Sequence, residues 1–221
     1  MHVPDADRPL DDAEWRAFVM AQGFGHLVAP GAARDRPVVV PTQFVLDNDD
    51  VLCHVAAPNP ILDALAERPT AVLSVAGDWA FVPSDWKAID DEDPRLGIPT
   101  TYYAAVQLAG PVDVVGDPDA LAAVLRRQLA TLQPDVEVAD PAAAHRRRLS
   151  AIRGLVLHVA DVSAKFKYGG NVDDAHRRAV LARLVERAAP GDAAAAAHAR
   201  RRLDPEPRPT PSAAEPRAPA G

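Results

Sequence analysis

The chain has very few lysines. Only three of its 221 residues are lysine, against 21 arginines, and two of the three lie together at Lys165 and Lys167. Lysine is a compact point charge on a flexible stem, which suits contact with a phosphate or an anionic ring edge. A lysine pair in so arginine-rich a chain is therefore a candidate for a chemical role. The alternative is a strand end that carries two solvated charges on one face.

Cysteine and long apolar runs are also scarce. Cys53 is the single cysteine, which excludes an intramolecular disulfide and a thiolate metal cage, so no metal site is expected. No segment approaches the roughly 18 apolar residues that span a bilayer. The N-terminus lacks the positive and then apolar pattern of a secretory signal. We therefore expect a cytoplasmic protein with no membrane partner.

Basic charge is outnumbered as well. The 31 acidic and 24 basic residues give a net charge of −7, so the chain lacks the basic footprint of a nucleic-acid-binding protein. DNA binding by a local patch stays open but has no support from the charge. The sequence also lacks a Walker loop, a dinucleotide-binding glycine fingerprint and a nucleophile elbow. No acid–base pair follows from spacing, so catalytic residues and enzymatic activity are left open.

The apolar pattern predicts six or seven strands, with helices at the edges and short turns between the strands. Asp47 and Asp50 flank an expected hairpin turn. These short turns favour an α+β antiparallel barrel or sandwich over a parallel sheet. From Ala188 the composition turns to Ala, Pro and Arg, which predicts a folded domain over 1–187 and a disordered tail over 188–221. The expected helices cover 11–22, a short stretch from 59, a stretch from 117, 140–154 and 173–187, and the expected strands cover 24–29, 37–46, 51–55, 70–75, 79–82, 100–115 and 155–162.

Two features favour an anionic or flat ligand. A helix is expected to begin at Asn59, directly after the strand that holds His54, and its free amides would attract a phosphate. Asn59 could instead simply cap its own helix. Tyr102 and Tyr103 could flank a flat ring or pack inside the barrel. His54 itself could be a hydrogen-bonded core imidazole.

The order of short motifs is similar to that of a known family. The motifs are Met1-His2-Val3-Pro4, Phe24-Gly25-His26-Leu27-Val28, Pro41-Thr42-Gln43-Phe44, His54-Val55-Ala56-Ala57-Pro58-Asn59-Pro60, Ala80-Phe81-Val82-Pro83-Ser84-Asp85-Trp86, Ile98-Pro99-Thr100 with Tyr103, and Lys165-Phe166-Lys167 with Asn171. Over roughly residues 1–187 the chain resembles the PaiB family of FMN-binding negative transcriptional regulators. That family has a split β-barrel fold related to the pyridoxamine-phosphate oxidases.

The resemblance implies a bacterial homodimer with one FMN near each subunit interface. It implies either a flavin-dependent oxidoreductase or a negative transcriptional regulator. The expected cofactor-binding residues are Pro41, Thr42, His54, Val55, Asn59, Thr100, Tyr102, Tyr103, Lys165 and Lys167.

Two stretches depart from the family pattern. Thr100-Thr101-Tyr102-Tyr103 stands where the family tends to have Thr-Trp-Asn-Tyr, and Tyr168-Gly169-Gly170-Asn171 stands where it tends to have Leu-Ser-Gln-Asn. The lost groups could hold a flavin's phosphate or ring edge. The alternatives are therefore a ligand-sensing regulator without FMN, or a split barrel that uses deazaflavin or haem.

Overall fold

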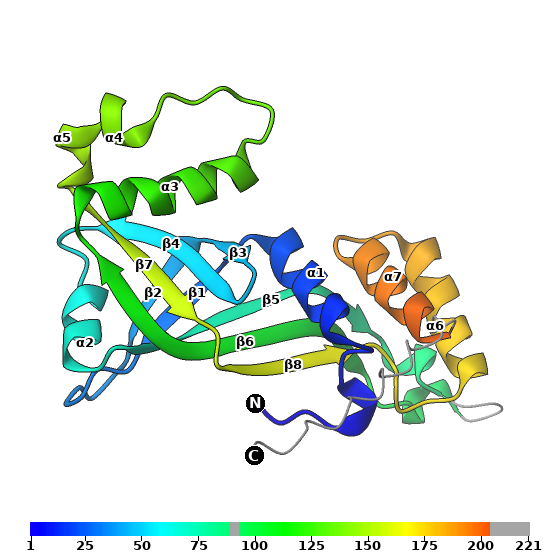
Figure 1. The fold of residues 1–221 in the computed structure, drawn as a ribbon. Helices are drawn as coiled ribbons and strands as arrows, with labels where there is room; N and C mark the ends of the chain where they lie inside the picture. Colours follow the sequence, from blue (N-terminus) through cyan, green and yellow to red (C-terminus); the bar gives the residue numbers. More distant parts are fainter. Residues whose placement is uncertain (89–92, 204–221) are drawn as a thin grey trace, which may run out of the picture.

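The fold is an antiparallel barrel surrounded by helices, seen in a computed structural model that describes residues 1–88 and 93–203 (Figure 1). Within these residues the strands form one eight-stranded sheet with every pairing antiparallel. The predicted fold class, an α+β antiparallel split β-barrel with peripheral helices, is confirmed. The strands are β1 (Phe24–Ala29), β2 (Val38–Gln43), β3 (Val45–Asp47), β4 (Asp50–Ala56), β5 (Thr70–Val82), β6 (Thr100–Val115), β7 (Ile152–His158) and β8 (Asp161–Lys167).

Strand β6 joins the two halves of the barrel. Its first part pairs with β5 and β8, and its last part, from Val112, pairs with β7. The change of partner occurs at Gly110, where a Cβ atom would lie 1.9 Å from the carbonyl oxygen of His158. Only glycine leaves room for that backbone approach. The sequence predicted both this long strand and a bend at this position.

Two helices pack on the main core. Helix α1 (Asp12–Gln22) is capped by Asp11, whose carboxylate accepts a hydrogen bond from the amide of Glu14 at 2.9 Å, as the spacing of these residues predicted. Its buried side chains include Trp15 and Phe18. Helix α2 (Ile61–Glu67) buries Ile61 and Leu65 in the same core.

A helical layer covers the outer face of β4 and β7 (Figure 1). It consists of α3 (Pro118–Leu132), α4 (Pro141–Ala144) and α5 (Arg146–Leu149). Val124 of α3 packs on Leu52 and Val156, which point outward from the barrel. The single helix predicted over 140–154 is wrong in extent, because the helical run is interrupted at His145 and Ile152 already pairs with Ala56 in the sheet.

Three predicted strand boundaries also change. The run 37–46 divides at Phe44 and the run 155–162 divides after His158. Conversely, the predicted strands 70–75 and 79–82 belong to one strand, β5. A bulge lies between Gly77 and Ala80, and the pairing with β6 continues on both sides of it. The bulge places Asp78 at a φ of 52°.

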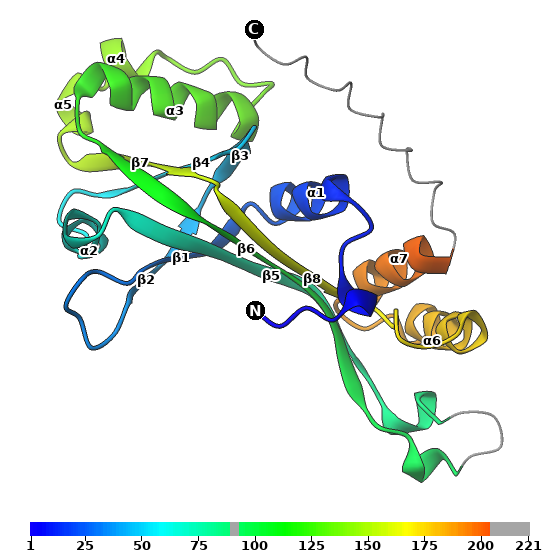
Figure 2. The same cartoon turned by 60° about the horizontal axis from the view of Figure 1, so that its bottom comes forward.

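The outer ends of β5 and β6 extend beyond the barrel as an arm (Figure 2). The short 3-10 turns η2 (Ser84–Trp86) and η3 (Pro94–Leu96) lie at the tip of the arm. Helices α6 (Asp174–Arg187) and α7 (Asp192–Leu203) lie side by side near the base of the arm. The predicted helix 173–187 is confirmed, with Asp173 as its cap.

The prediction of a disordered tail from Ala188 is wrong for residues 192–203. These residues form α7, whose Ala195, Ala196 and Ala199 are buried in the main core. The sequence analysis took an alanine-rich segment to have too little apolar surface to fold. In the structure, the small alanine side chains let the helix pack closely against the barrel. The remainder of the predicted tail, 204–221, lies outside the described residues. In residues 1–88 and 93–203, no helix is long and apolar enough to cross a membrane.

Candidate functional site

Four predicted site residues lie on β2 and β4, with their side chains on different faces. Thr42 and Val55 are buried, and Val55 belongs to the main core. Pro41 and His54 are exposed. On these two strands, therefore, Pro41 and His54 are the predicted residues with side chains available to a ligand.

The His54 imidazole is held by Gln128 of α3. The amide nitrogen of Gln128 donates to the backbone oxygen of Leu52 at 3.2 Å, so its side-chain oxygen faces Nδ1 of His54 at 3.0 Å. Nδ1 must then carry a proton, which leaves Nε2 of the neutral ring as a hydrogen-bond acceptor. The sequence analysis missed Gln128, although the signal was present as a glutamine within the apolar stripe of α3.

A cavity of about 380 Å³ opens beside this imidazole, and we call it the His54 cavity. It lies between the outer face of β4 and the helical layer. Its lining combines leucine and isoleucine side chains with a few polar groups, the composition typical of small-molecule sites. The apolar lining includes Leu125, Leu129, Leu132 and Ile152, and the polar lining includes Gln43, His54, His145 and Arg148.

Asn59 caps its own helix. Its side-chain oxygen accepts a hydrogen bond from the amide of Ile61 at 3.1 Å. Helix α2 is only seven residues long, so its dipole is weak and one of its first amides is already occupied. Asn59 is thus accounted for by local structure.

Four other predicted residues lie close together on β6 and β8. Tyr103 pairs directly with Lys167 in the sheet, and the Lys165 ammonium lies 5.8 Å from the centre of the Tyr103 ring. Lys167 donates to the Thr100 hydroxyl at 2.7 Å. Alternation along the two strands places Tyr103, Lys165 and Lys167 on one face. Thr100 is three positions before Tyr103 and so has the opposite orientation along β6, and the long Lys167 side chain reaches its hydroxyl.

Tyr102 faces the opposite way, into the core. It is fully buried and packs edge-on against Tyr168 at 5.9 Å between ring centres. Burial raises the pKa of Tyr102 to about 12, and the positive charge of Arg177 offsets only part of this effect. Of the two alternatives for the tyrosine pair, packing inside the barrel therefore applies to Tyr102. The Tyr103 side chain is the one that can contact a flat ring.

The two groups of predicted residues lie in different parts of the molecule. Pro41 is on β2 and His54 is on β4, which the helical layer covers, whereas Thr100 and Tyr103 are on β6 at its end toward the arm, beside the lysine pair of β8 (Figures 1 and 2). One chain does not bring them to a common site.

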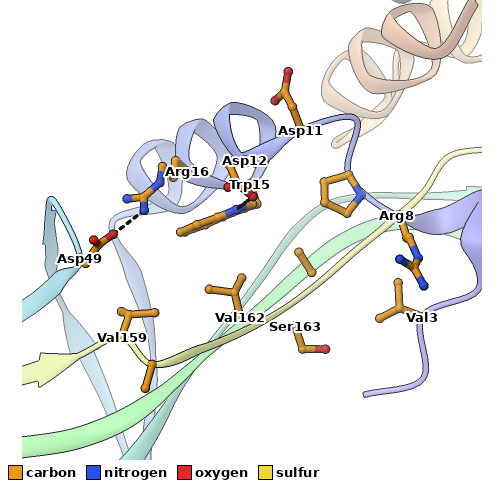
Figure 3. Close-up of a pocket in the computed structure, with 13 residues that line it drawn as sticks. Val3, Arg8, Asp11, Asp12, Trp15, Arg16, Asp49, Val159, Val162 and Ser163 are labelled. Carbon is orange, nitrogen blue, oxygen red and sulfur yellow. Dashed lines mark hydrogen bonds and ion pairs between the residues drawn. The ribbon is translucent and has the colours of Figure 1, made fainter. Parts of the chain in front are cut away.

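A second cavity, of about 640 Å³, lies between α1 and β8 (Figure 3). Trp15, Val162 and Ser163 face it, and Arg16 at its rim pairs with Asp49. None of the ten predicted cofactor-binding residues lines this cavity. Its two arginines, Arg8 and Arg16, are each paired with an aspartate, whereas Asp11 and Asp12 accept hydrogen bonds within α1, so the described lining offers no unpaired cation to an anionic ligand.

Comparison with known proteins supplies the family. The chain belongs to the family described as "Putative FMN-binding domain", whose model matches residues 1–161. No curated protein sequence matches the chain.

Solved structures show the same fold at low sequence identity. The flavocytochrome Anf3 from Azotobacter vinelandii is 21% identical, with a TM-score of 0.57 over 75% of this chain and 72% of that one. The FAD- and haem-binding protein from Mycobacterium smegmatis is 20% identical, also with a TM-score of 0.57, over 79% of this chain and 78% of that one. The chain therefore shares the fold of these proteins.

Proposed function

We propose that this protein is a homodimeric split-barrel flavoprotein of the PaiB type that binds FMN. The observation that carries the proposal is the match of the family model to residues 1–161, which include strands β1 to β7 of the barrel, together with the His54 cavity on the outer face of that barrel. A flavin would supply the redox chemistry, and the protein would supply position, electrostatics and exclusion of water.

The lining of the His54 cavity fits a flavin. A volume of about 380 Å³ lies in the range of small-molecule sites, roughly 300–1,000 Å³. The leucine and isoleucine side chains suit the flat ring, and Nε2 of His54 is placed to accept from its imide N–H. Arg148, which also lines the cavity, suits an anionic part of the ligand.

The departures from the family pattern have structural explanations. Tyr168 is buried and donates to the backbone oxygen of Asp78 at 2.9 Å. Gly170 is crossed by the N-terminal segment, since a Cβ there would lie 1.9 Å from the backbone oxygen of Ala6. Tyr102 fills the core. These replacements therefore follow from packing, and they remove less support from flavin binding than the sequence suggested.

A second copy would complete the site. Tyr103 and the lysine pair are far from the His54 cavity along one chain, so we propose that they reach the flavin of the partner subunit. The arm offers a surface for this contact, because four large apolar side chains on or next to it are at least half exposed. Such patches mark interaction sites. These side chains are Trp79, Phe81, Leu96 and Ile98.

A visible absorbance scan of the purified protein, repeated after addition of FMN and dialysis, tests flavin binding. We expect retained flavin bands and a dimer by light scattering. The His54→Ala variant should weaken FMN binding about tenfold, the effect of one lost hydrogen bond of about 1.4 kcal/mol. His26→Ala is the matched control, because His26 is an exposed histidine on β1 that does not line the cavity. A colourless protein that ignores added FMN would refute the proposal.

Other cofactors are the alternative within the same fold. Two of the structural relatives are a flavocytochrome and an FAD- and haem-binding protein. We therefore propose FAD, haem and deazaflavin as the next ligands if FMN fails, tested by the same titration. Retention of haem would appear as an intense Soret band, which flavins lack.

A regulator without turnover is the alternative from another class. The PaiB resemblance supports a regulator, whereas the net charge of −7 gives no support to DNA binding. A gel shift on the protein's own promoter region at several salt concentrations tests it. A specific complex should weaken steeply as salt rises, because DNA contacts release counterions. Absence of a shift in low salt would exclude direct DNA binding at that site.

A further inference from the structure

Another cavity lies in the helical layer, between α3 and the loop 133–140 that joins α3 to α4. The loop runs above α3 from the end of that helix back to α4 (Figure 1). The volume of the cavity is about 320 Å³, which lies in the range of small-molecule sites. We call it the Val136 cavity. It is built by one stretch of the chain, outside the barrel.

The two sides of the Val136 cavity are mainly apolar. Leu129 and Ala130 of α3 line one side, and Val136 and Val138 of the loop line the other. The loop valines are 57% and 40% exposed. Apolar side chains that meet water around one cavity are covered at a gain in free energy when an apolar ligand binds. The loop therefore presents an apolar face to a ligand.

The charged groups at this cavity form an ion pair. Nε of Arg126 lies 2.7 Å from the Asp140 carboxylate, and the same carboxylate caps α4. Asp135 and Glu137 are exposed on the same loop. An anionic ligand would meet an arginine that is already paired and a loop that carries acidic residues, so electrostatics disfavour it. The Val136 cavity therefore suits an uncharged ligand.

One wall of the Val136 cavity is shared with the His54 cavity. Leu129, Gln133 and Pro141 line both cavities. Gln133 is the uncharged polar side chain of this wall, and its amide can donate and accept a hydrogen bond. A ligand with one polar group can therefore place that group at Gln133 and its apolar body on the loop valines.

We propose that the Val136 cavity is a binding site for an uncharged, mainly apolar small molecule with one polar group, the class that includes phenols, alcohols and ketones. The apolar sides supply the affinity, the ion pair selects against anions, and Gln133 orients the polar group. The site is separate from the proposed flavin site and does not depend on it. The shared wall places its ligand next to the contents of the His54 cavity.

The test is a titration of the full-length protein with β-naphthol, followed by the probe's fluorescence and by the methyl NMR signals of Val136 and Val138. We expect both signals to saturate. β-Naphthoate has the same rings but carries a carboxylate. It should bind at least about tenfold more weakly, because transfer of a charge into an apolar site is costly.

Substitutions of the loop valines locate the site. Val136→Asp and Val138→Asp should each weaken β-naphthol binding at least about tenfold, because a charged group replaces an apolar contact. Val185→Asp is the matched control, since Val185 is a 56% exposed valine on α6 that does not line the cavity. Its affinity for β-naphthol should stay within about twofold of the wild type.

A further variant tests the polar group. Gln133→Leu should weaken β-naphthol binding about fivefold, because it removes one hydrogen bond. Naphthalene lacks the hydroxyl, so its binding should be unchanged or tighter in this variant. Equal weakening of both probes would refute the role of Gln133.

Three outcomes would overturn the proposal. These are a titration that does not saturate, equal weakening by Val185→Asp, and unchanged affinity in both loop variants. If, in that last case, FMN displaces β-naphthol, the probe occupies the His54 cavity instead. Because β-naphthol is titrated without FMN, failure of the flavin proposal leaves this test intact.

Discussion

Glu14 on α1 and Arg202 on α7 form a buried ion pair that joins the two helices. The guanidinium lies 3.0 Å from the carboxylate, and the side chains are only 2% and 5% exposed. Nδ1 of His198, on the same helix, faces the carboxylate at 3.7 Å, and Nε2 donates to the Asp78 carboxylate at 2.9 Å. The His198 ring stacks on Tyr168 at 4.5 Å. This network fixes α7 to the barrel.

Removal of Arg202 should destabilise the protein strongly. Arg202→Met leaves the Glu14 charge buried without its main partner, which typically costs about 3–5 kcal/mol. Urea unfolding followed by circular dichroism would measure the loss. Arg201→Met, at the exposed neighbour, is the control and should change stability by less than about 0.5 kcal/mol. Equal effects of the two substitutions would show that the pair contributes little.

The same pair predicts the response to acid. Burial alone would raise the pKa of Glu14, but His198, Arg202 and the amide of Leu10 together lower it from 4.5 to about 2. A lowered folded-state pKa stabilises the protein above the unfolded value, and this contribution disappears as the pH falls from about 4.5 to about 2. Glu14→Gln should flatten the stability profile in this window. A profile of unchanged slope would contradict the assignment.

His158 predicts the opposite dependence at higher pH. Asp113, at 3.0 Å, and Asp50, at 2.8 Å, raise the pKa of His158 above 6.5. Its stabilising contribution is therefore complete below pH 6.5 and is lost as the pH rises through the folded-state pKa. The ring is largely exposed, so the effect should stay below about 1 kcal/mol. An NMR titration of the wild type and of Asp113→Asn should show a lower His158 pKa in the variant.

The N-terminal segment passes so close to Gly170 that a side chain at this position should destabilise the protein. A Cβ at this position would lie 1.9 Å from the backbone oxygen of Ala6, so Gly170→Ala must displace that segment. We expect a loss of about 1–3 kcal/mol, typical of overpacking. Faster hydrogen exchange around Ala6 would locate the effect. Gly116→Ala is the control, since its nearest neighbour beyond the adjoining residues is the flexible Arg153 side chain at 3.4 Å.

Periodicity and capping residues were sufficient for much of the fold. The helix from Asp12 was predicted by its cap and apolar stripe, and the long strand β6 by its continuous apolar run. These signals are local, because each depends on residues a few positions apart. The bulge at Asp78 was not predicted, since the partner strand supplies the pairing that holds β5 together.

Local alternation also determines how two of the candidate site residues are oriented. Alternation along β8 placed Lys165 and Lys167 on one face, and the structure agrees. The contact between His54 and Gln128 joins segments 74 positions apart, and single-sequence reasoning carries no such information. Helix α7 was missed because its alanines become a packing surface only against the barrel.

Glu14 and Arg202 are 188 positions apart, which has a consequence for biosynthesis. Helix α1 leaves the ribosome 188 positions before the guanidinium that neutralises its buried carboxylate. Until then, the carboxylate must stay hydrated, and the aromatic side chains that α7 covers in the folded protein must stay exposed to solvent. The nascent chain therefore needs protection from aggregation while the intervening residues are synthesised, and premature termination before Arg202 would destabilise α1 as well as α7.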